Sequence, residues 1–134
     1  MLTFRSGDDA IQGGVDITIS LTPTQSAAIG PEASSLADWF DTALWTLAAL
    51  RSEGHEPTAD QLYTTLNDIE ARLLPRLEGI RDAAVRRHKE LGGSVGDLGL
   101  ALDMPRSTAQ SRREALEKRG PSNWEKWATG TTGN

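Results

Sequence analysis

Residues 94–117 of the chain, SVGDLGLALDMPRSTAQSRREALE, predict two helices joined by a tight turn. Ser94 can act as the N-cap of the first helix, and Asp97 places a favourable negative charge in its first turn. Pro105 has the φ angle that the start of a helix requires, so we expect the second helix over residues 106–118. We therefore expect the C-terminal half of the chain to be built around this pair of helices.

Small and apolar residues stand in this stretch where two helices must cross closely. Gly99 leaves room for the second helix, and Asp103 belongs to the few residue types besides glycine that tolerate a left-handed turn conformation. The residues expected to face the interior are Leu98, Leu102, Met104, Ala109 and Leu116. The pattern therefore predicts a packed helix-turn-helix.

Residues 82–118 resemble the helix-turn-helix of bacterial DNA-binding proteins, and they are most similar to short actinobacterial and sigma-factor-region-four-like units. The second helix of such units often contains the pattern Thr-Val-x-Ser-Arg, and this chain has Thr108-Ala109-Gln110-Ser111-Arg112. Arg113 follows at a position where an apolar residue is common. The resemblance implies a second helix that enters the major groove of double-stranded DNA, with its N-terminal residues leading.

This resemblance also implies which side chains touch DNA. Four residues near the start of the second helix would contact base edges: Arg106, Ser107, Gln110 and Ser111. Nine others would contact phosphates: Ser94, Thr108, Arg112, Arg113, Lys118, Arg119, Arg86, Arg87 and Lys89. Ordinary structural roles stay open to the same side chains, as helix caps, as partners of nearby carboxylates or as a solvated helix face.

The charge of the chain is divided unevenly along its length. Residues 1–80 hold four basic and twelve acidic residues, a net charge of −8, whereas residues 81–134 hold ten basic and seven acidic residues, a net charge of +3. A uniformly acidic chain would argue against binding to a polyanion. The division is compatible with a DNA-binding C-terminal part and an acidic N-terminal part that holds a protein partner.

Two apolar stripes precede the basic part of the chain. Large apolar residues recur at spacings of four and three over residues 36–50 and again over residues 62–73, which predicts two amphipathic helices. Thr58 and Gln61 form a capping box, and the short connection makes the helices antiparallel neighbours. We expect this hairpin to bury part of its stripes and also to form a homodimer interface through Leu36, Trp39, Phe40, Leu44, Leu47, Leu62 and Leu66.

Three further segments carry weaker patterns. Residues 15–21 alternate apolar and polar side chains, which predicts one short strand in an otherwise irregular N-terminal arm, paired with a second copy or left extended. Pro75 favours a break or sharp kink in the helix near Leu74. Trp124 and Trp127 share one face of a helical turn, where they pack on the core or, alternatively, bind a partner or stack on a base.

Several classes of function find no support in the sequence. The chain has no cysteine, which excludes disulfides and thiolate chemistry. Neither His55 nor His88 has a partner at metal-ligand spacing, and no nucleophile–base arrangement or phosphate loop is present. We expect no enzyme activity, cofactor or metal. We also expect no signal peptide and no membrane span, and hence a cytoplasmic protein.

The sequence therefore predicts an all-α fold: a helical hairpin followed by a helix-turn-helix unit, with a short N-terminal arm. The expected parts are an arm at 1–30, the hairpin at 31–80, the DNA-binding unit at 81–120 and a tail at 121–134. The expected function is sequence-specific binding of double-stranded DNA, as a small homodimeric transcriptional regulator. The alternatives are an adaptor or inhibitor whose helix-turn-helix does not bind DNA, and a plasmid or phage DNA-processing accessory protein.

Overall fold

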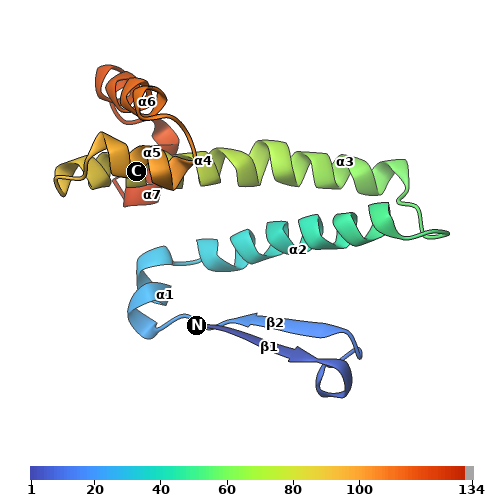
Figure 1. The fold of residues 1–134 in the computed structure, drawn as a ribbon. Helices are drawn as coiled ribbons and strands as arrows, with labels where there is room; N and C mark the ends of the chain where they lie inside the picture. The colour runs from blue at the N-terminus through green and yellow to red at the C-terminus, as the bar shows by residue number, and fades with distance from the viewer. Residues whose placement is uncertain (132–134) are drawn as a thin grey trace. The chain divides into compact units, whose positions relative to one another are not determined.

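The computed structural model describes residues 1–131 of the chain. Helices make up 69% of the structure and the sheet is small, which confirms the expected all-α class with a short strand region at the N-terminus. The chain divides into two compact units, Met1–Asp38 and the part from Trp39 onward. This boundary lies eight residues beyond the expected end of the N-terminal arm, inside a long helix. We describe each unit by itself (Figure 1).

The first unit begins with a β-hairpin. Strand β1 (Leu2–Ser6) pairs antiparallel with strand β2 (Val15–Ile19), and Phe4 lies opposite Ile17. A short 3-10 turn, η1 (Gly7–Asp9), lies in the connection between the strands. The prediction of one strand without a partner inside the chain was therefore wrong. Residues 2–6 alternate apolar and polar side chains as β2 does, so each strand satisfies the backbone of the other.

Two helices follow the β-hairpin. Helix α1 (Pro23–Ile29) lies in the N-terminal arm, which was expected to be irregular apart from one strand. The Thr22 hydroxyl accepts a hydrogen bond from the Gln25 backbone N–H at 3.1 Å, and Gln25 accepts one from the Thr22 N–H at 3.0 Å. This capping box, with proline in the first turn, fixes a helix start. Helix α2 (Glu32–Arg51) begins close to the expected position.

In the second unit, α2 runs antiparallel to helix α3 (Ala59–Asn67), as the two apolar stripes predict (Figure 1). The capping box of Thr58 and Gln61 is confirmed, with the Thr58 hydroxyl accepting from the Gln61 N–H at 3.3 Å. Between the helices, the buried hydroxyls of Thr46 and Thr65 are hydrogen-bonded at 2.7 Å. A polar pair therefore joins α2 and α3 at their line of contact.

The helix does not break at Pro75. Helix α3 passes through a π-helical segment, η2 (Asp68–Leu73), into helix α4 (Leu74–Glu90), and Figure 1 draws the three as one uninterrupted helix. The Leu74 N–H bonds to the Ile69 carbonyl five residues back. Such a widened turn accommodates a residue that lacks an N–H and crowds the preceding turn. Of the expected break or sharp kink, the break was therefore wrong.

Three more helices complete the second unit: α5 (Val95–Leu102), α6 (Arg106–Arg119) and α7 (Asn123–Thr129). The core formed by α4, α5 and α6 consists of Val85, Leu98, Ala109 and Leu116, all at most 5% exposed. Helix α7 packs on α4 so closely that a Cβ on Gly79 would lie 2.6 Å from the Trp124 carbonyl oxygen. Half of the expected tail at 121–134 is therefore a packed helix, and its last three residues lie outside the described part of the chain.

Candidate nucleic-acid interface

The turn between α5 and α6 has the geometry that the sequence predicts. Asp103 ends α5 with φ of 52° in the left-handed region. The Met104 N–H bonds to the Gly99 carbonyl at 2.9 Å, and a Cβ on Gly99 would lie 2.9 Å from the Met104 carbonyl oxygen. Only glycine fits at this crossing without displacing the turn. Ser94 caps α5 as expected, accepting a hydrogen bond from the Asp97 N–H at 3.1 Å.

Helix α6 buries one side and presents the other to solvent. Ala109 and Leu116 point inward, at 0% and 5% exposure. The opposite side carries exposed polar residues at spacings of four and three, which places them on one face: Ser107, Ser111, Glu114 and Lys118. The Ser111 hydroxyl donates to the Ser107 carbonyl at 3.1 Å. Two of the four expected base-contacting residues therefore lie on the outward face of α6.

The other two expected base-contacting residues, Arg106 and Gln110, lie on one flank of α6. Both are exposed, and both line a surface hollow that also includes Lys89 and Arg113. The Gln110 amide donates to the Glu114 carboxylate at 3.0 Å, so it reaches along the helix toward the outward face. The four side chains therefore occupy adjoining positions at the N-terminal half of the helix.

Two of the residues expected to contact phosphate form ion pairs with buried carboxylates of the protein. Arg86 on α4 pairs through Nε with the buried Glu125 carboxylate and donates from Nη2 to the Leu116 carbonyl at 2.7 Å. Arg119 donates to Glu125 Oε2 at 2.7 Å and lies 3.6 Å from Asp82. We call Arg86, Arg119, Glu125 and Asp82 the buried ion cluster. It joins α4, α6 and α7, and its carboxylates offset the positive charge that the two arginines would otherwise offer to DNA.

Glu125 is the centre of the buried ion cluster. Burial by itself would raise the pKa of its carboxyl group, but hydrogen bonds from Arg86, from the Ser122 backbone N–H and from Arg119 outweigh burial and lower the pKa to about 2. Glu125 also completes the capping box of α7 with Ser122. The spacing from Ser122 to Glu125 could have revealed the cap, whereas the pairing with Arg86 spans 39 residues and leaves no local signal.

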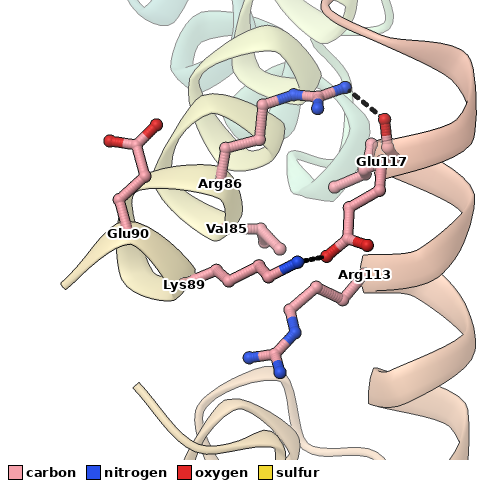
Figure 2. A pocket seen from close by; sticks show the side chains of 7 residues that line it. Val85, Arg86, Lys89, Glu90, Arg113 and Glu117 are labelled. Atoms are coloured by element: carbon pink, nitrogen blue, oxygen red, sulfur yellow. Dashed lines mark hydrogen bonds and ion pairs between the residues drawn. The ribbon is translucent and has the colours of Figure 1, made fainter. Parts of the chain in front are cut away.

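A second group of expected phosphate contacts lies in the groove between α4 and α6 (Figure 2). Lys89 forms an ion pair with Glu117, and the hydrogen bond from Lys89 lowers the pKa of the Glu117 carboxyl group. The Arg113 guanidinium donates to the Gly93 carbonyl at 3.0 Å, which explains why a charged residue stands at this position of α6. On α4, Arg87 pairs with Glu90 at 3.0 Å, both of them exposed.

The remaining residues that were expected to contact DNA are not held in ion pairs within the described part of the chain. Arg106, Arg112 and Lys118 make no ion pair among residues 1–131, and Thr108 is exposed on α6. Residues 94–119 contain five basic and four acidic residues, so the local positive charge is small. A single copy therefore presents few cations to a phosphate backbone.

An aromatic cluster joins α2, α4 and α7. The Arg76 guanidinium lies 4.6 Å from the centre of the Trp39 ring and 4.5 Å from that of Trp124, in cation–π geometry. Trp127 meets Trp124 edge to face, with ring centres 5.8 Å apart. All three tryptophans are half-buried. Sequence reasoning identified the tryptophan pair but not Arg76, because an arginine on a charged helix carries no distinguishing pattern.

The residues expected at the dimer interface fall into two groups. Phe40, Leu44, Leu47 and Leu66 are 45–62% exposed. Leu36, Trp39 and Leu62 are half-buried, and Trp39 is engaged with Arg76.

The described part of the chain offers no cluster of histidines, cysteines or carboxylates that could hold a metal ion. Within it, no helix combines the length and the apolar character needed to cross a lipid bilayer. Comparison with known proteins found no matching family model, no similar curated protein and no similar solved structure.

Proposed function

We propose that this chain is a sequence-specific DNA-binding protein, a small bacterial transcriptional regulator that acts as a homodimer in the cytoplasm. The observation that carries the proposal is the α5–turn–α6 unit: the left-handed Asp103, the close contact at Gly99 and the packed core of Leu98, Ala109 and Leu116. This arrangement holds the exposed polar face of α6 outward on a rigid support. Such a face is what a recognition helix offers to the major groove.

Arg106 and Gln110 supply the hydrogen-bonding groups for specificity. Arginine binds guanine and glutamine binds adenine through paired hydrogen bonds, each pair contributing roughly 1–3 kcal/mol of discrimination. Ser107 and Ser111 lie next to them and accept or donate to either kind of base pair. Arg112 and Lys118 flank these residues and contact phosphates, and Thr108 adds a hydroxyl.

Of the basic side chains expected to contact DNA, only a small number in one copy are free of ion pairs within the described part of the chain, and this small number supports action as a dimer. Affinity for the DNA backbone grows with the number of phosphates that the protein neutralises. One copy offers Arg106, Arg112 and Lys118, whereas two copies double this number and contact two half-sites about 34–36 Å apart. The acidic N-terminal part keeps attraction to non-specific DNA low.

The test is selection of bound sequences from a pool of random duplex DNA, followed by fluorescence anisotropy of the selected duplex at several salt concentrations. We expect an enriched palindromic sequence and an association constant whose logarithm falls linearly with the logarithm of salt, by about 0.9 per phosphate contacted. The double variant Arg106→Ala/Gln110→Ala should bind the selected duplex at least about 100-fold more weakly, while its circular dichroism stays that of the wild type.

The matched control is Arg51→Ala, which removes one positive charge at the end of α2, away from the helix-turn-helix. It should leave the affinity for the selected duplex unchanged. Absence of DNA binding at low salt, or equal losses in the two variants, would overturn the proposal. Enrichment of transfer or packaging origins rather than promoter regions in a genomic pool would instead point to a DNA-processing accessory protein.

A second candidate function is a helical adaptor or inhibitor whose helix-turn-helix does not bind DNA. The ion pairs of Arg86, Arg119 and Lys89 favour this alternative, because they neutralise cations that a DNA-binding surface would use. The acidic Glu114 on the outward face of α6 favours it too. In that case the double variant at Arg106 and Gln110 would bind the protein partner as tightly as the wild type does, whereas substitutions on α2 would abolish this binding.

A further inference from the structure

The hairpin of α2 and α3 has two unlike sides. The buried pair of Thr46 and Thr65 marks the line where the helices meet. Leu47 and Leu66 each follow one of these threonines by one residue, so both are rotated by about 100° from the contact line. Because the helices are antiparallel, equal rotations from the contact line point to the same side of the hairpin. Leu47 and Leu66 therefore stand side by side on one surface.

The same relation holds for other positions of the hairpin. Leu50 on α2 and Ile69 in η2 follow the threonines by four residues, and Leu62 precedes Thr65 by three. These residues, with Phe40 and Leu44 on the same flank of α2, form what we call the apolar face: Phe40, Leu44, Leu47, Leu50, Leu62, Leu66 and Ile69. Five of the seven are 45–66% exposed.

The opposite side of the hairpin is polar. Trp45 and Thr64 precede the two threonines by one residue, and both line a surface hollow together with Asp41 and Gln61. Asp41 and Asp60 precede Thr46 and Thr65 by five residues each, which places both carboxylates on this side. These two aspartates are thus kept away from the apolar face, whereas Arg51 and Glu70, which follow the threonines by five residues each, lie at its edge and are opposite in charge.

The apolar face supplies a large part of the area that a stable interface needs. Each of its exposed side chains leaves on the order of 100 Å² in contact with water, so the face as a whole exposes several hundred Å². Isolated monomers rarely expose a contiguous apolar patch above about 300–600 Å². A standard interface buries about 800 Å² on each partner, which is within reach of this face and its margins.

We propose that the apolar face packs against the same face of a second copy of this chain, so that two helical hairpins form an antiparallel four-helix bundle. A twofold interface uses one patch on both partners, and an uncharged patch meets its own copy without repulsion between like charges. That matters here because residues 1–80 carry a net charge of −8. Two stacked hairpins bury the stripes that one hairpin leaves exposed, as four-helix bundles do.

The proposal of a dimer is argued from the apolar face alone. Only the expectation that the dimer places two DNA-binding units together rests on the proposed function. The structure assigns dimerisation to the hairpin and leaves the outward face of α6 free in both copies. Trp39 is not part of the interface, because its ring is stacked on Arg76.

The test is sedimentation velocity of the full chain without DNA, from about 1 to 200 μM. We expect a dimer, and we expect Leu66→Glu to raise its dissociation constant more than about 100-fold, because the substitution places a carboxylate on the interface in both copies. Thr64→Glu is the matched control: it adds the same charge two residues away on the polar side of α3 and should leave the dimer intact. A monomeric wild type at 200 μM would overturn the proposal, as would equal effects of the two variants.

A second measurement keeps the proposal testable if Leu66→Glu fails to fold. The chain has no cysteine, so Leu47→Cys introduces a single thiol. We expect mild oxidation to convert this variant into a disulfide-linked dimer, whereas Thr64→Cys stays monomeric on a denaturing gel. A linked dimer from Thr64→Cys and none from Leu47→Cys would contradict the assigned face. Because DNA is absent from both experiments, failure of the dimer and failure of DNA binding are separate results.

Discussion

The helix-turn-helix and the helical hairpin carry the same kind of leucine stripe but use it differently. In the helix-turn-helix, Leu98 and Leu116 are 4% and 5% exposed, because α4, α5 and α6 close around them. In the hairpin, Leu44 and Leu66 are 57% and 62% exposed, because two helices cover only one line of contact. The spacing of apolar residues thus identifies the face of a helix that becomes buried. It does not show whether the same chain or another molecule buries that face.

This difference is also a difference in thermodynamics. A core formed within one chain stabilises the fold at any protein concentration. A face that is covered by a second copy contributes stability that depends on concentration, since only the dimer buries it. The stability lost by a leucine-to-alanine substitution should therefore be independent of protein concentration in the helix-turn-helix and depend on it in the hairpin.

Leucine-to-alanine substitutions should separate the two regions most clearly. Leu98→Ala removes a buried side chain that contacts Val85, Ala109 and Leu116, and it should lower the free energy of unfolding by about 3 kcal/mol. Leu44→Ala removes a side chain that is half exposed, and in dilute solution it should cost less than about 1 kcal/mol. Urea unfolding followed by circular dichroism measures both.

Repeating the urea series at increasing protein concentration sharpens the comparison. The loss caused by Leu98→Ala should stay constant, whereas the loss caused by Leu44→Ala should grow as the wild type dimerises. A large, concentration-independent loss for Leu44→Ala would show that the leucine is covered within its own chain, contrary to the exposed fraction.

Disruption of the buried ion cluster should lower the free energy of unfolding by about as much as Leu98→Ala does, or slightly less. Glu125→Gln leaves Arg86 without a carboxylate partner and leaves Arg119 with Asp82 alone, at 3.6 Å, and it should lower the free energy of unfolding by about 3 kcal/mol at pH 7. The control is Glu90→Gln, which removes an exposed partner of Arg87 and should change stability by less than about 0.5 kcal/mol. Urea unfolding of the two variants side by side tests the cluster.

The pKa of Glu125 fixes the pH at which this contribution disappears. The pKa falls from an ordinary value of 4.5 to about 2 in the folded protein, so the unfolded chain takes up the proton first as pH decreases. The contribution is complete above about pH 4.5 and is lost between about pH 4.5 and 2. The stability difference between wild type and Glu125→Gln should therefore narrow below pH 4.5; a difference that stays constant down to pH 2.5 would contradict the assignment.

Local chemistry made much of the fold predictable from the sequence. The cap at Ser94, the glycine at the crossing and the proline at the start of α6 act through residues within a few positions of one another, and each appears in the structure as expected. The same rules applied to Thr22 and Gln25 would have revealed α1, and the alternation of residues 2–6 would have revealed β1. Both elements are therefore encoded by residues close together in the sequence.

The sequence could not predict which of the expected phosphate ligands are paired within the protein and which are exposed. Arg86 and Arg113 look like phosphate ligands in the sequence, yet the partners that occupy them are Glu125, the Leu116 carbonyl and the Gly93 carbonyl. These partners lie 20 to 39 residues away along the chain, so only the packing of α4, α6 and α7 brings them together. The exposed residues at the start of α6 follow from helical spacing alone and were predictable.

The smallest effect should come from the contact line of the hairpin itself. The hydroxyls of Thr46 and Thr65 are hydrogen-bonded to each other, and each also lies within hydrogen-bonding distance of a carbonyl four residues back, at 2.8 Å and 3.0 Å. Because each hydroxyl has one proton, one threonine donates to the other and the second donates to its own carbonyl. Replacing Thr65 alone by valine removes one partner of a buried hydroxyl and should cost about 1 kcal/mol, whereas the double replacement should cost little more, because neither polar group is then left unmatched. A double-mutant cycle by urea unfolding measures this coupling.

The threonine pair lies between α2 and α3 of one chain and not on the apolar face. The dissociation constant of the dimer should therefore be the same in the wild type and in both variants. A weakened dimer would mean that the second copy contacts the hairpin along the line between α2 and α3.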